Sequence, residues 1–512
     1  MFSILHTWSK TGLIILLLLL QLSCLANVKI AGVFSDHMVL QRDETIHIWG
    51  TTDNTETITV SFANRKIKTI SRNNTWEVEF PPVQAGGPFS ISVEGKSNTL
   101  LLKDILIGDV WICAGQSNMR FRINQAYDAA MTTASAINND LRLSDWEGRL
   151  EPINKKYSLA FLRELNSSNY YTTPSWKTTD SASVSTFSAV GYYFGKNLQE
   201  AIHVPVGLIN NAIGGVPVET YIPLSALKAD PLLYPLAEND WMNSSLYPVW
   251  TAERINQNLA AWKEAGAELP LPGHPYQPGY LFDAGIMPLK KLAVKGVIWY
   301  QGESNATFTG DSTAMDPALN KKKLQLLINS WREHFNNKEL PFIIIQLPAI
   351  KRDWELYREV QMELSKEMKN VDLVVTLDLG NANDVHPRNK KTAGERAARA
   401  ALGNIYQKPI IASGPIYDSY RVEGNKIIVS FVGNTGMGLG TTDGQPLRKI
   451  LICGEDNVFY SANAVFRKNE LWLSSDKVAH PVIARYAWED NPSDANLSNT
   501  EGLPASPFRT DK

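Results

Sequence analysis

The first pattern along the chain is an alternation of apolar and polar residues between about residues 28 and 105. Alternation with a period of two is typical of strands that bury one face and expose the other. Polar, turn-rich breaks such as residues 72–74 and 85–88 separate the alternating segments. Short strands at this spacing predict a small β-sandwich over residues 27–105. Its clearest strands are residues 57–62, 66–70, 75–80 and 89–93.

After residue 105, continuously apolar runs alternate with segments of helical periodicity. Runs without polar interruption are typical of strands buried on both faces, so they predict a parallel sheet covered by helices on either side. We therefore expect an α/β core over residues 106–410. The predicted strands are residues 108–114, 204–209, 294–300, 341–346 and 372–377. The predicted helices cover about residues 188–201, 324–335, 354–368 and 390–406.

Two long stretches, residues 120–185 and 220–285, break this rhythm. Both are rich in Trp, Tyr, Pro and Asn and show little periodicity. Because they follow strand ends, they predict insertions that form the walls of a binding site. Alternation returns after residue 410, which predicts a second β module over residues 411–512, with a last extended segment at 481–488.

The first 26 residues have the features of a secretory signal peptide. Lys10 precedes an apolar run at residues 12–20, and small residues follow up to Ala26. The run is too short to span a bilayer comfortably. We expect cleavage near Ala26, a secreted or periplasmic mature chain, and no stable membrane insertion. A lipoprotein anchor on Cys24 is the alternative. The two remaining cysteines, Cys113 and Cys453, lie in apolar runs and are expected to be buried free thiols.

Composition narrows the range of ligands. A formal net charge of −2 argues against a nucleic-acid surface or a polybasic membrane patch. The His residues lack metal-ligand spacing and the Cys residues are not paired in sequence, so no metal site is expected. The 14 Trp and 18 Tyr residues include candidates for stacking on sugar rings, although core packing accounts for most of them.

Candidate chemistry gathers at strand ends, which is where open parallel sheets bind ligands. The apolar strand 108–114 runs into residues 115–119, Gly-Gln-Ser-Asn-Met, which places Ser117 in a strand-to-helix turn. A serine there can act as a nucleophile, with nearby backbone N–H groups to stabilise an oxyanion. The Gly-x-Ser-x-Gly elbow is absent, so a plain strand-to-loop turn is the alternative.

His386 follows another predicted strand and stands two residues after Asp384. A serine hydroxyl needs a base at neutral pH, and histidine has a suitable pKa. A nearby carboxylate can fix the imidazole tautomer and stabilise its cation. The alternative is a helix start in which Asn383 or Asp384 is the cap and Pro387 occupies the first turn.

Two further strand ends carry polar segments. The pair Gly214-Gly215 lets the backbone approach a substrate, so an N–H there could donate to an oxyanion. Gln301 could donate a side-chain amide to the same anion, and Glu303 is a spare carboxylate. An ordinary glycine turn and a buried structural glutamate are the alternatives.

Taken together, these blocks resemble the SGNH hydrolases, specifically the sialate O-acetylesterase branch of the carbohydrate esterases. The resemblance implies an α/β protein with an SGNH-type (flavodoxin-like) three-layer α/β/α core around a parallel sheet, flanked by β-sandwich modules. It also implies deacetylation of an O-acetylated sugar without a metal or organic cofactor. It covers nearly the whole mature chain. The matching segments are 115–119, 214–215, 299–303 (WYQGE), 384–387 (DVHP) with Lys390 or Lys391 after it, 34–41 (FSDHMVLQ), 486–488 (YAW) and 502–508 (GLPASPF).

The resemblance implies roles for individual residues. Ser117 corresponds to the nucleophile and His386 to the base. The oxyanion donors correspond to the N–H of Ser117, the N–H of Gly215 (or Gly214) and the Gln301 amide.

The acid partner stays open. Asp384 stands two residues before His386, whereas the wider superfamily places its aspartate three before, where this chain has Asn383. Glu303 is the reserve acid, and a Ser–His dyad braced by a backbone carbonyl is a further alternative. Arg120 and Arg122 follow the nucleophile and are candidates to bind a sialate carboxylate, with solvated or structural roles as the alternative.

The resulting expectation is a serine esterase that removes O-acetyl groups from sialic acid through an acetyl-enzyme intermediate. Its partner is then an O-acetylated sialic acid or another acetylated glycan. An acetylxylan or pectin acetylesterase is the alternative with the same chemistry. A non-catalytic carbohydrate-binding protein is the alternative from another class. The sequence leaves the oligomeric state open.

Overall fold

The central feature of the fold is one strand, β8 (Thr99–Gly115), which runs through two parts of the molecule. The computed structural model describes residues 27–511, apart from 173, 267–271 and 307–315. The predicted signal peptide and Cys24 lie outside the described residues. No helix in the described part is long and apolar enough to cross a membrane.

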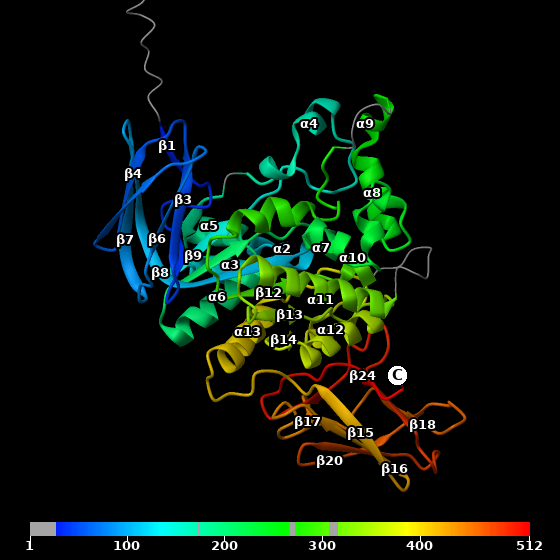
Figure 1. The fold of residues 1–512 in the computed structure, drawn as a ribbon. Coiled ribbons are helices and arrows are strands. Elements are labelled where there is room, and N and C mark those ends of the chain that lie inside the picture. The colour runs from blue at the N-terminus through cyan, green and yellow to red at the C-terminus, as the bar shows by residue number, and fades with distance from the viewer. Residues whose placement is uncertain (1–26, 173, 267–271, 307–315, 512) are drawn as a thin grey trace, which may run out of the picture.

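The N-terminal part is a pair of facing sheets, as the alternating pattern predicts (Figure 1). One sheet has the order β1-β3-β6, and in the other β4 lies between β5 and β7. Inward-facing side chains such as Ile48, Val60 and Val93 are fully buried between them. The strands are β1 (Val28–Ile30), β2 (Val39–Gln41), β3 (Ile46–Thr52), β4 (Thr57–Phe62), β5 (Arg65–Ile70), β6 (Thr75–Phe80) and β7 (Gly86–Glu94).

Strand β8 joins this part to the core. Its first half pairs with β7 and β2, and its second half pairs in parallel with β11 and β12. The boundary expected at residue 105 therefore falls inside a continuous strand. The core strands lie in the order β10-β9-β11-β8-β12-β13-β14. Their bounds are β9 (Leu141–Asp145), β10 (Trp176–Thr178), β11 (Val206–Asn210), β12 (Gly296–Tyr300), β13 (Phe342–Ile345) and β14 (Val371–Val374).

The sheet is mixed and larger than the expected parallel sheet. Strands β9, β11, β8, β12, β13 and β14 run parallel, whereas β10 is antiparallel to β9. The stretch 120–185 is thus more than an insertion, because it supplies both β9 and β10.

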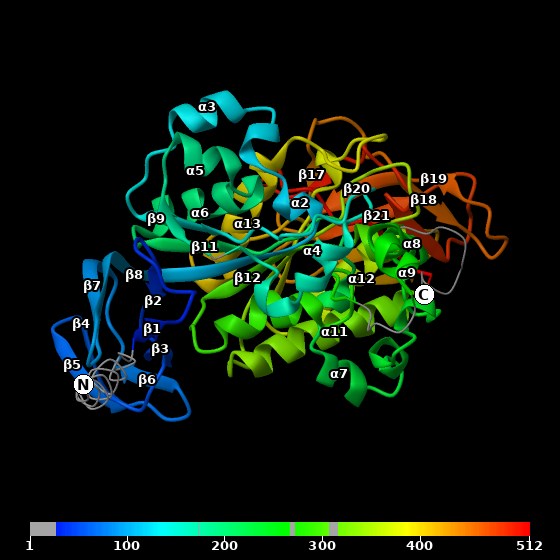
Figure 2. The ribbon, with the colours of Figure 1, turned by 90° about the horizontal axis from the view of Figure 1, so that it is seen from above.

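Helices cover both faces of the core sheet. Helices α6 (Ala189–Ile202) and α13 (Lys390–Ala400) pack together on one face. Helices α11 (Pro317–His334) and α12 (Glu355–Glu367) pack on the other. Figure 2 shows the sheet between these two pairs, which makes the core a three-layer α/β/α arrangement.

Capping groups fix where the long helices start. The Ser188 hydroxyl accepts the N–H of Gly191 at the start of α6, and the Asn389 side chain accepts the N–H of Thr392 at the start of α13. The other, shorter helices are α2 (Ser117–Arg120), η1 (Ile123–Gln125), α3 (Ala129–Ala134), α4 (Leu159–Glu164), η2 (Ser167–Asn169), α5 (Ser181–Thr186), η3 (Val218–Tyr221), α7 (Leu224–Ala229), η4 (Tyr234–Ala237), η5 (Trp241–Asn243), α8 (Val249–Asn258), α9 (Ala260–Glu264), η6 (Phe282–Ile286), η7 (Met287–Leu289), α10 (Glu303–Ala306), η9 (Leu377–Leu379) and η10 (Ala401–Ile405).

The C-terminal part is the expected second β module, and its last residues return to the core (Figure 1). Arg509 pairs with Glu359 of α12 at 3.0 Å, and Phe508 stacks on Tyr417 with ring centroids 5.1 Å apart. The strands are β15 (Tyr417–Glu423), β16 (Lys426–Phe431), β17 (Gly440–Thr441), β18 (Ile450–Cys453), β19 (Tyr460–Ser461), β20 (Asn463–Arg467), β21 (Glu470–Ser474), β22 (Ile483–Tyr486), β23 (Leu497–Ser498) and β24 (Phe508–Arg509). Cys113 and Cys453 are buried free thiols, as predicted.

A buried carboxylate in β8 fastens the N-terminal part to the core. The Asp109 side chain is fully buried and accepts two hydrogen bonds from the Arg42 guanidinium, at 2.9 and 3.0 Å. It also accepts from Gln41 Nε2 at 3.0 Å and from the Tyr406 hydroxyl at 2.8 Å. A buried charge is tolerated when it is paired and fully hydrogen-bonded in this way.

Removing the cation is expected to destabilise the whole chain. Arg42→Leu leaves the Asp109 carboxylate without its charge partner, so the free energy of unfolding should fall by about 3–5 kcal/mol. The double variant Arg42→Leu/Asp109→Asn removes both charges and should recover most of that loss. Urea unfolding followed by tryptophan fluorescence measures both values. Equal instability of the single and double variants would show that packing, and not charge pairing, is responsible.

Candidate active site

Three neighbouring parallel strands, β11, β8 and β12, end side by side and bring their following residues together. The backbone of Gly115 at the end of β8 has φ +135°, and a Cβ there would lie 2.1 Å from the Tyr300 carbonyl oxygen. Glycine is therefore required where β8 passes the end of β12. This close passage sets Ser117 at the start of α2, at the carboxyl edge of the sheet.

A cavity of about 510 Å³ opens at this edge, and several predicted residues line it: Ser117, Gly214, Gly215, Glu303, His386 and Arg120. An adjoining hollow of about 620 Å³ shares Ser117 and His386 and adds Arg122. Residues from strand ends far apart in the sequence thus meet around one serine. The cavity wall includes Trp250, Arg254, Tyr276 and Arg352, which sequence patterns did not single out.

Two backbone donors are available beside the serine. Within the described part of the chain, the N–H groups of Ser117 and Gly215 have no hydrogen-bond partner. Gly215 has φ +69°, and a Cβ on Gly214 would lie 4.0 Å from the Ser117 Cβ, so the glycine turn packs against the serine. The turn is held from behind, because Ser304 Oγ donates to the Gly215 carbonyl at 2.9 Å.

Gln301 does not lie where an oxyanion donor is needed. Its side chain is fully buried, and its amide nitrogen donates to the Val216 carbonyl at 3.2 Å and to Asn305 Oδ1 at 2.7 Å. Both amide hydrogens are thereby used, and the residue does not line the cavity. Gln301 braces the turn that carries Gly215. The strand pattern placed this residue at the sheet edge but could not show which way its side chain points.

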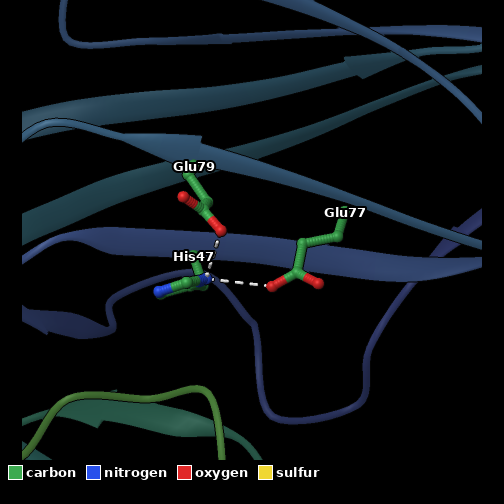
Figure 3. A group of neighbouring side chains, drawn as sticks. All are labelled: His47, Glu77 and Glu79. Atoms are coloured by element: carbon green, nitrogen blue, oxygen red, sulfur yellow. Dashed lines mark hydrogen bonds and ion pairs between the residues drawn. The ribbon is translucent and has the colours of Figure 1, made fainter.

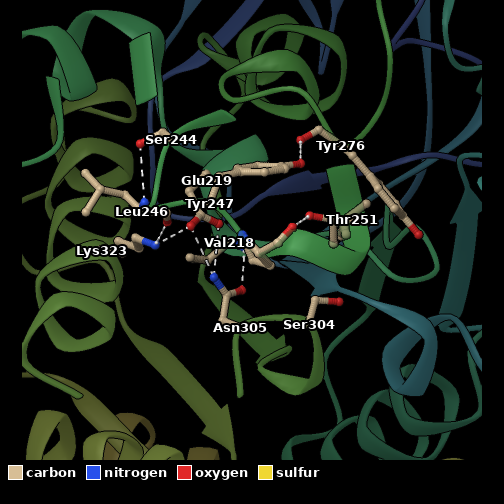
Figure 4. Close-up of polar contacts among 12 residues, drawn as sticks. Val218, Glu219, Ser244, Leu246, Tyr247, Thr251, Tyr276, Ser304, Asn305 and Lys323 are labelled. Atoms are coloured by element: carbon tan, nitrogen blue, oxygen red, sulfur yellow. Dashed lines mark hydrogen bonds and ion pairs between the residues drawn. The ribbon is translucent and has the colours of Figure 1, made fainter. Parts of the chain in front are cut away.

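The brace continues into a buried ion pair (Figure 4). Asn305 Oδ1 also accepts the N–H of Val218 at 2.9 Å, and its Nδ2 donates to both carboxylate oxygens of Glu219 at 3.2 and 3.0 Å. Glu219 pairs with Lys323 of α11 at 2.5 Å, and both side chains are at most 1% exposed. Lys323 thus acts on the Gly215 turn through Glu219 and Asn305.

His386 lies in the loop before α13, and its ring faces the cavity lined by Ser117. Its imidazole forms no hydrogen bond within the described residues. Burial first, and the positive charge of Lys390 second, lower the pKa of His386 below its usual value, while Asp384 opposes this. The imidazole is therefore neutral near pH 7, which is the state that a general base needs.

Asp384 contacts the backbone of His386 and not its ring. The exposed Asp384 carboxylate accepts the N–H of His386 at 2.9 Å. This contact is a local turn and differs from the expected triad geometry, in which the carboxylate accepts from the ring. The spacing of two residues explains the difference, because it forms a local turn around the loop backbone. The capping alternative is also wrong, because α13 begins at Lys390 with Asn389 as its cap.

Asn118 joins two buried ionisable groups near the serine. Its Nδ2 donates to Glu303 Oε1 and to the Val385 carbonyl, and its Oδ1 accepts from Lys390. Burial raises the pKa of Glu303 to about 7 and lowers the pKa of Lys390 to about 7. Glu303 Oε2 is buried without a hydrogen-bond partner in the described residues. Glu303 therefore reaches the His386 loop through Asn118.

The two arginines expected near a sialate carboxylate are already paired. Arg120 binds Glu151 at 2.5 Å, and Arg122 binds Glu147. Both glutamates come from the stretch 120–185, which folds back over the serine turn. These ion pairs favour the structural alternative for both arginines.

One group in the described residues could offer three metal-ligand atoms: His47, Glu77 and Glu79 (Figure 3). His47 Nδ1 lies 2.9 Å from Glu77 Oε1, and Glu77 also pairs with Lys291. A cation would need to displace a lysine there. The group stands on β3 and β6 of the N-terminal part, so it contributes nothing to the cavity around Ser117.

Comparisons with known proteins identify carbohydrate esterases as relatives of this chain. Residues 276–403 match the family described as "Carbohydrate esterase, sialic acid-specific acetylesterase". The solved structure of a carbohydrate acetylesterase from Xanthomonas citri is 30% identical, with a TM-score of 0.77 over 95% of this chain and 100% of that chain. The sialate O-acetylesterase of Rattus norvegicus is 26% identical over 97% of both chains, and that of Homo sapiens is 25% identical over 94% of this chain and 92% of its own.

The α/β core and its strand-end cavity, together with these matches, define an enzyme that hydrolyses acetyl esters of carbohydrates. The chain belongs to the family of sialate O-acetylesterase-like carbohydrate esterases. This assignment excludes the alternative of a non-catalytic carbohydrate-binding protein.

An isosteric substitution tests the buried brace. Asn305→Asp places a carboxylate against Glu219, so one of the two must take up a proton. At pH 7 we expect the free energy of unfolding to fall by about 3 kcal/mol and esterase turnover to fall with it. Because a carboxyl with a raised pKa loses stability as pH rises, the deficit should shrink between pH 8 and pH 5.

The matched control exchanges the two groups. The double variant Asn305→Asp/Glu219→Gln keeps one carboxylate, one amide and the Lys323 contact, so stability and turnover should return. Thermal unfolding at several pH values and aryl acetate hydrolysis measure the two properties. The electrostatic explanation would be contradicted if the loss of stability did not depend on pH and persisted in the double variant.

Proposed function

We propose that this enzyme is a sialate O-acetylesterase in which Ser117 is the nucleophile and His386 is the base. The observation that carries the proposal is that Ser117, His386 and the Gly215 turn line one cavity at the carboxyl edge of the sheet. The names of the mammalian relatives and of the family model support sialic acid as the sugar. We further propose that the three-layer core is of the SGNH type and that the chain is secreted or periplasmic after removal of residues 1–26.

The reaction follows from the groups around the serine. His386 takes the Ser117 hydroxyl proton as the oxygen attacks the acetyl carbonyl carbon. The N–H groups of Ser117 and Gly215 donate to the resulting oxyanion, since neither has a partner in the part of the chain that the structure describes. The imidazolium returns its proton to the departing sugar alcohol. Water, deprotonated by His386, then attacks the acetyl-enzyme. The bond between the acetyl carbon and Ser117 Oγ breaks, His386 returns the proton to Oγ, and acetate leaves.

We propose that the His386 imidazole is held in position by the fixed backbone of its loop and is influenced by the negative charge of Asp384. The Asp384 carboxylate holds the backbone of His386 and raises its pKa from a distance. Asn118 fixes the same loop through the Val385 carbonyl and links it to Glu303. In this arrangement Glu303 positions the loop that carries the base, and no carboxylate of the described residues binds the ring.

Replacing the nucleophile tests the central assignment. Ser117→Ala should lower acetate release from an O-acetylated sialic acid by at least about 10³-fold, because other groups cannot form the acyl-enzyme. Ser168→Ala changes an exposed serine that does not line the cavity and is the matched control. Full activity of Ser117→Ala would falsify the mechanism.

The same assay decides the sugar. The Xanthomonas citri relative is described as a carbohydrate acetylesterase without a named sugar, so acetylxylan or acetylated pectin is the second candidate substrate. Wild-type enzyme should release acetate fastest from the sialic acid derivative. Faster release of acetate from acetylxylan or pectin would be consistent with Ser117 as the nucleophile but would show that sialic acid is not the preferred sugar.

The role of Asp384 can be separated from that of a triad aspartate. Asp384→Asn should lower kcat by less than about tenfold, whereas removing a ring-orienting carboxylate costs about 10⁴-fold. Because Asp384 raises the pKa of His386, its removal should move the acid limb of the kcat/KM profile to lower pH. Rate measurements between pH 4 and pH 8 give both values; a 10⁴-fold loss would assign Asp384 to the ring.

A further inference from the structure

Helix α8 presents two side chains to the cavity, Trp250 and Arg254, which stand four residues apart and therefore on one face of the helix. Trp250 lies next to the reaction centre. Its indole Nε1 donates to the Ser304 carbonyl at 3.2 Å, and its ring would be 3.3 Å from a Cβ on Gly215. Arg254 follows four residues later, about 6 Å along the axis. Arg254 thus lines the same cavity as Trp250, Ser117 and Gly215.

Arg254 is held in place by a neutral group. Its Nη1 donates to the Pro152 carbonyl at 3.1 Å, and the Tyr276 hydroxyl, which lies beside the same carbonyl, donates to the Gly214 carbonyl at 3.2 Å. This contact orients the guanidinium without neutralising it. The side chain is half-buried in the cavity wall, so its remaining N–H groups are available to donate hydrogen bonds to a ligand.

The charges around the cavity set Arg254 apart from the arginines near the serine. Arg120 and Arg122 each bind a glutamate. Arg254 has no carboxylate partner among the described residues. Glu151, the acid nearest in sequence to Pro152, is engaged by Arg120, and its pKa is lowered by Arg120 and Arg122. The cavity therefore contains a cation that its own acids leave unneutralised.

We propose that Arg254 binds the carboxylate of the sugar and makes the enzyme selective for acidic sugars. The inference rests on the proposed function and names the residue that recognises the acid group. A guanidinium donates two parallel hydrogen bonds to a carboxylate and gives up hydration more readily than an ammonium does. Because Trp250 and Arg254 line the same cavity as Ser117, a sugar whose acetyl group lies at Ser117 would have its carboxylate bound by the Arg254 guanidinium.

Removing the charge from the substrate and from the residue tests this pairing directly. The substrates are an O-acetylated N-acetylneuraminic acid and its C1 carboxamide, which keeps the acetyl ester and loses the negative charge. Wild-type enzyme should prefer the free acid by about 10- to 100-fold in kcat/KM, mainly through KM. Arg254→Gln should abolish the preference, and Arg254→Lys should keep only part of it, because a lysine cannot donate in the same planar geometry.

Comparison variants make the result specific. Arg352 also lines the cavity, so Arg352→Gln tests another cation at the same site, and Arg72→Gln changes an exposed arginine of the N-terminal part. Both should retain the preference for the free acid. Loss of the preference in Arg352→Gln, with retention in Arg254→Gln, would overturn the assignment. So would a wild-type enzyme that hydrolyses acid and carboxamide equally well.

The outcomes also separate this inference from the function on which it rests. Equal hydrolysis of the two sialic acid derivatives leaves the sialate esterase activity standing and refutes only the role of Arg254. Failure to release acetate from either one, with rapid release from acetylxylan, refutes the proposed substrate. Retention of a free-acid preference by a folded Arg254→Gln variant, with wild-type thermal unfolding, refutes the inference alone.

Discussion

The continuous pairing of β8 is the constraint on which the rest of the structure depends. This one strand completes a sheet of the N-terminal sandwich and then becomes the middle of the core sheet, between β11 and β12. Parallel pairing aligns the ends of the three strands, so residues 115–117, 211–215 and 301–303 are delivered to one edge. The position of Ser117 is a consequence of sheet register, and the close passage of Gly115 by Tyr300 fixes that register.

Satisfying buried polar groups shapes the rest of the site. The turn that carries Gly215 is irregular backbone next to the core, and its carbonyl groups need donors. Ser304, Gln301 and Tyr276 supply them, and Asn305 passes the constraint on to the Glu219–Lys323 pair. A polar network of this kind is stable only when complete. The N–H groups of Ser117 and Gly215, which have no partner within the described residues, are therefore exceptions to the pattern.

Periodicity predicted the parts of the fold in which burial follows sequence closely. Predicted strands such as 57–62 and 75–80 match β4 and β6, and the helix expected at 188–201 is α6 at Ala189–Ile202. Strand β9 was missed because polar side chains interrupt it. Arg142 is buried there only because it donates to Asp104 and to the Asn139 carbonyl, partners that are far from obvious in the sequence.

For the site, sequence patterns predicted which residues lie at the strand ends but not how their side chains are oriented. Strand ends identified Ser117, Gly215 and His386, which do share a cavity. The direction of the Gln301 side chain depends on Asn305 and Val216, and the charge available at Arg120 depends on Glu151. Arg254 lies in an aperiodic stretch with no motif, so only its three-dimensional surroundings identify it.

The end of the chain has a consequence for the order of assembly. Strand β24 forms an edge of the sheet β19-β18-β22-β24, and Arg509 reaches back to Glu359 on α12, 150 residues earlier. Gln346, at the end of β13, likewise donates to Ser506 at 2.9 Å. These contacts cannot form until residues 506–509 have been synthesised. During synthesis, Glu359 and Gln346 of the core therefore lack these partners until β24 joins its sheet.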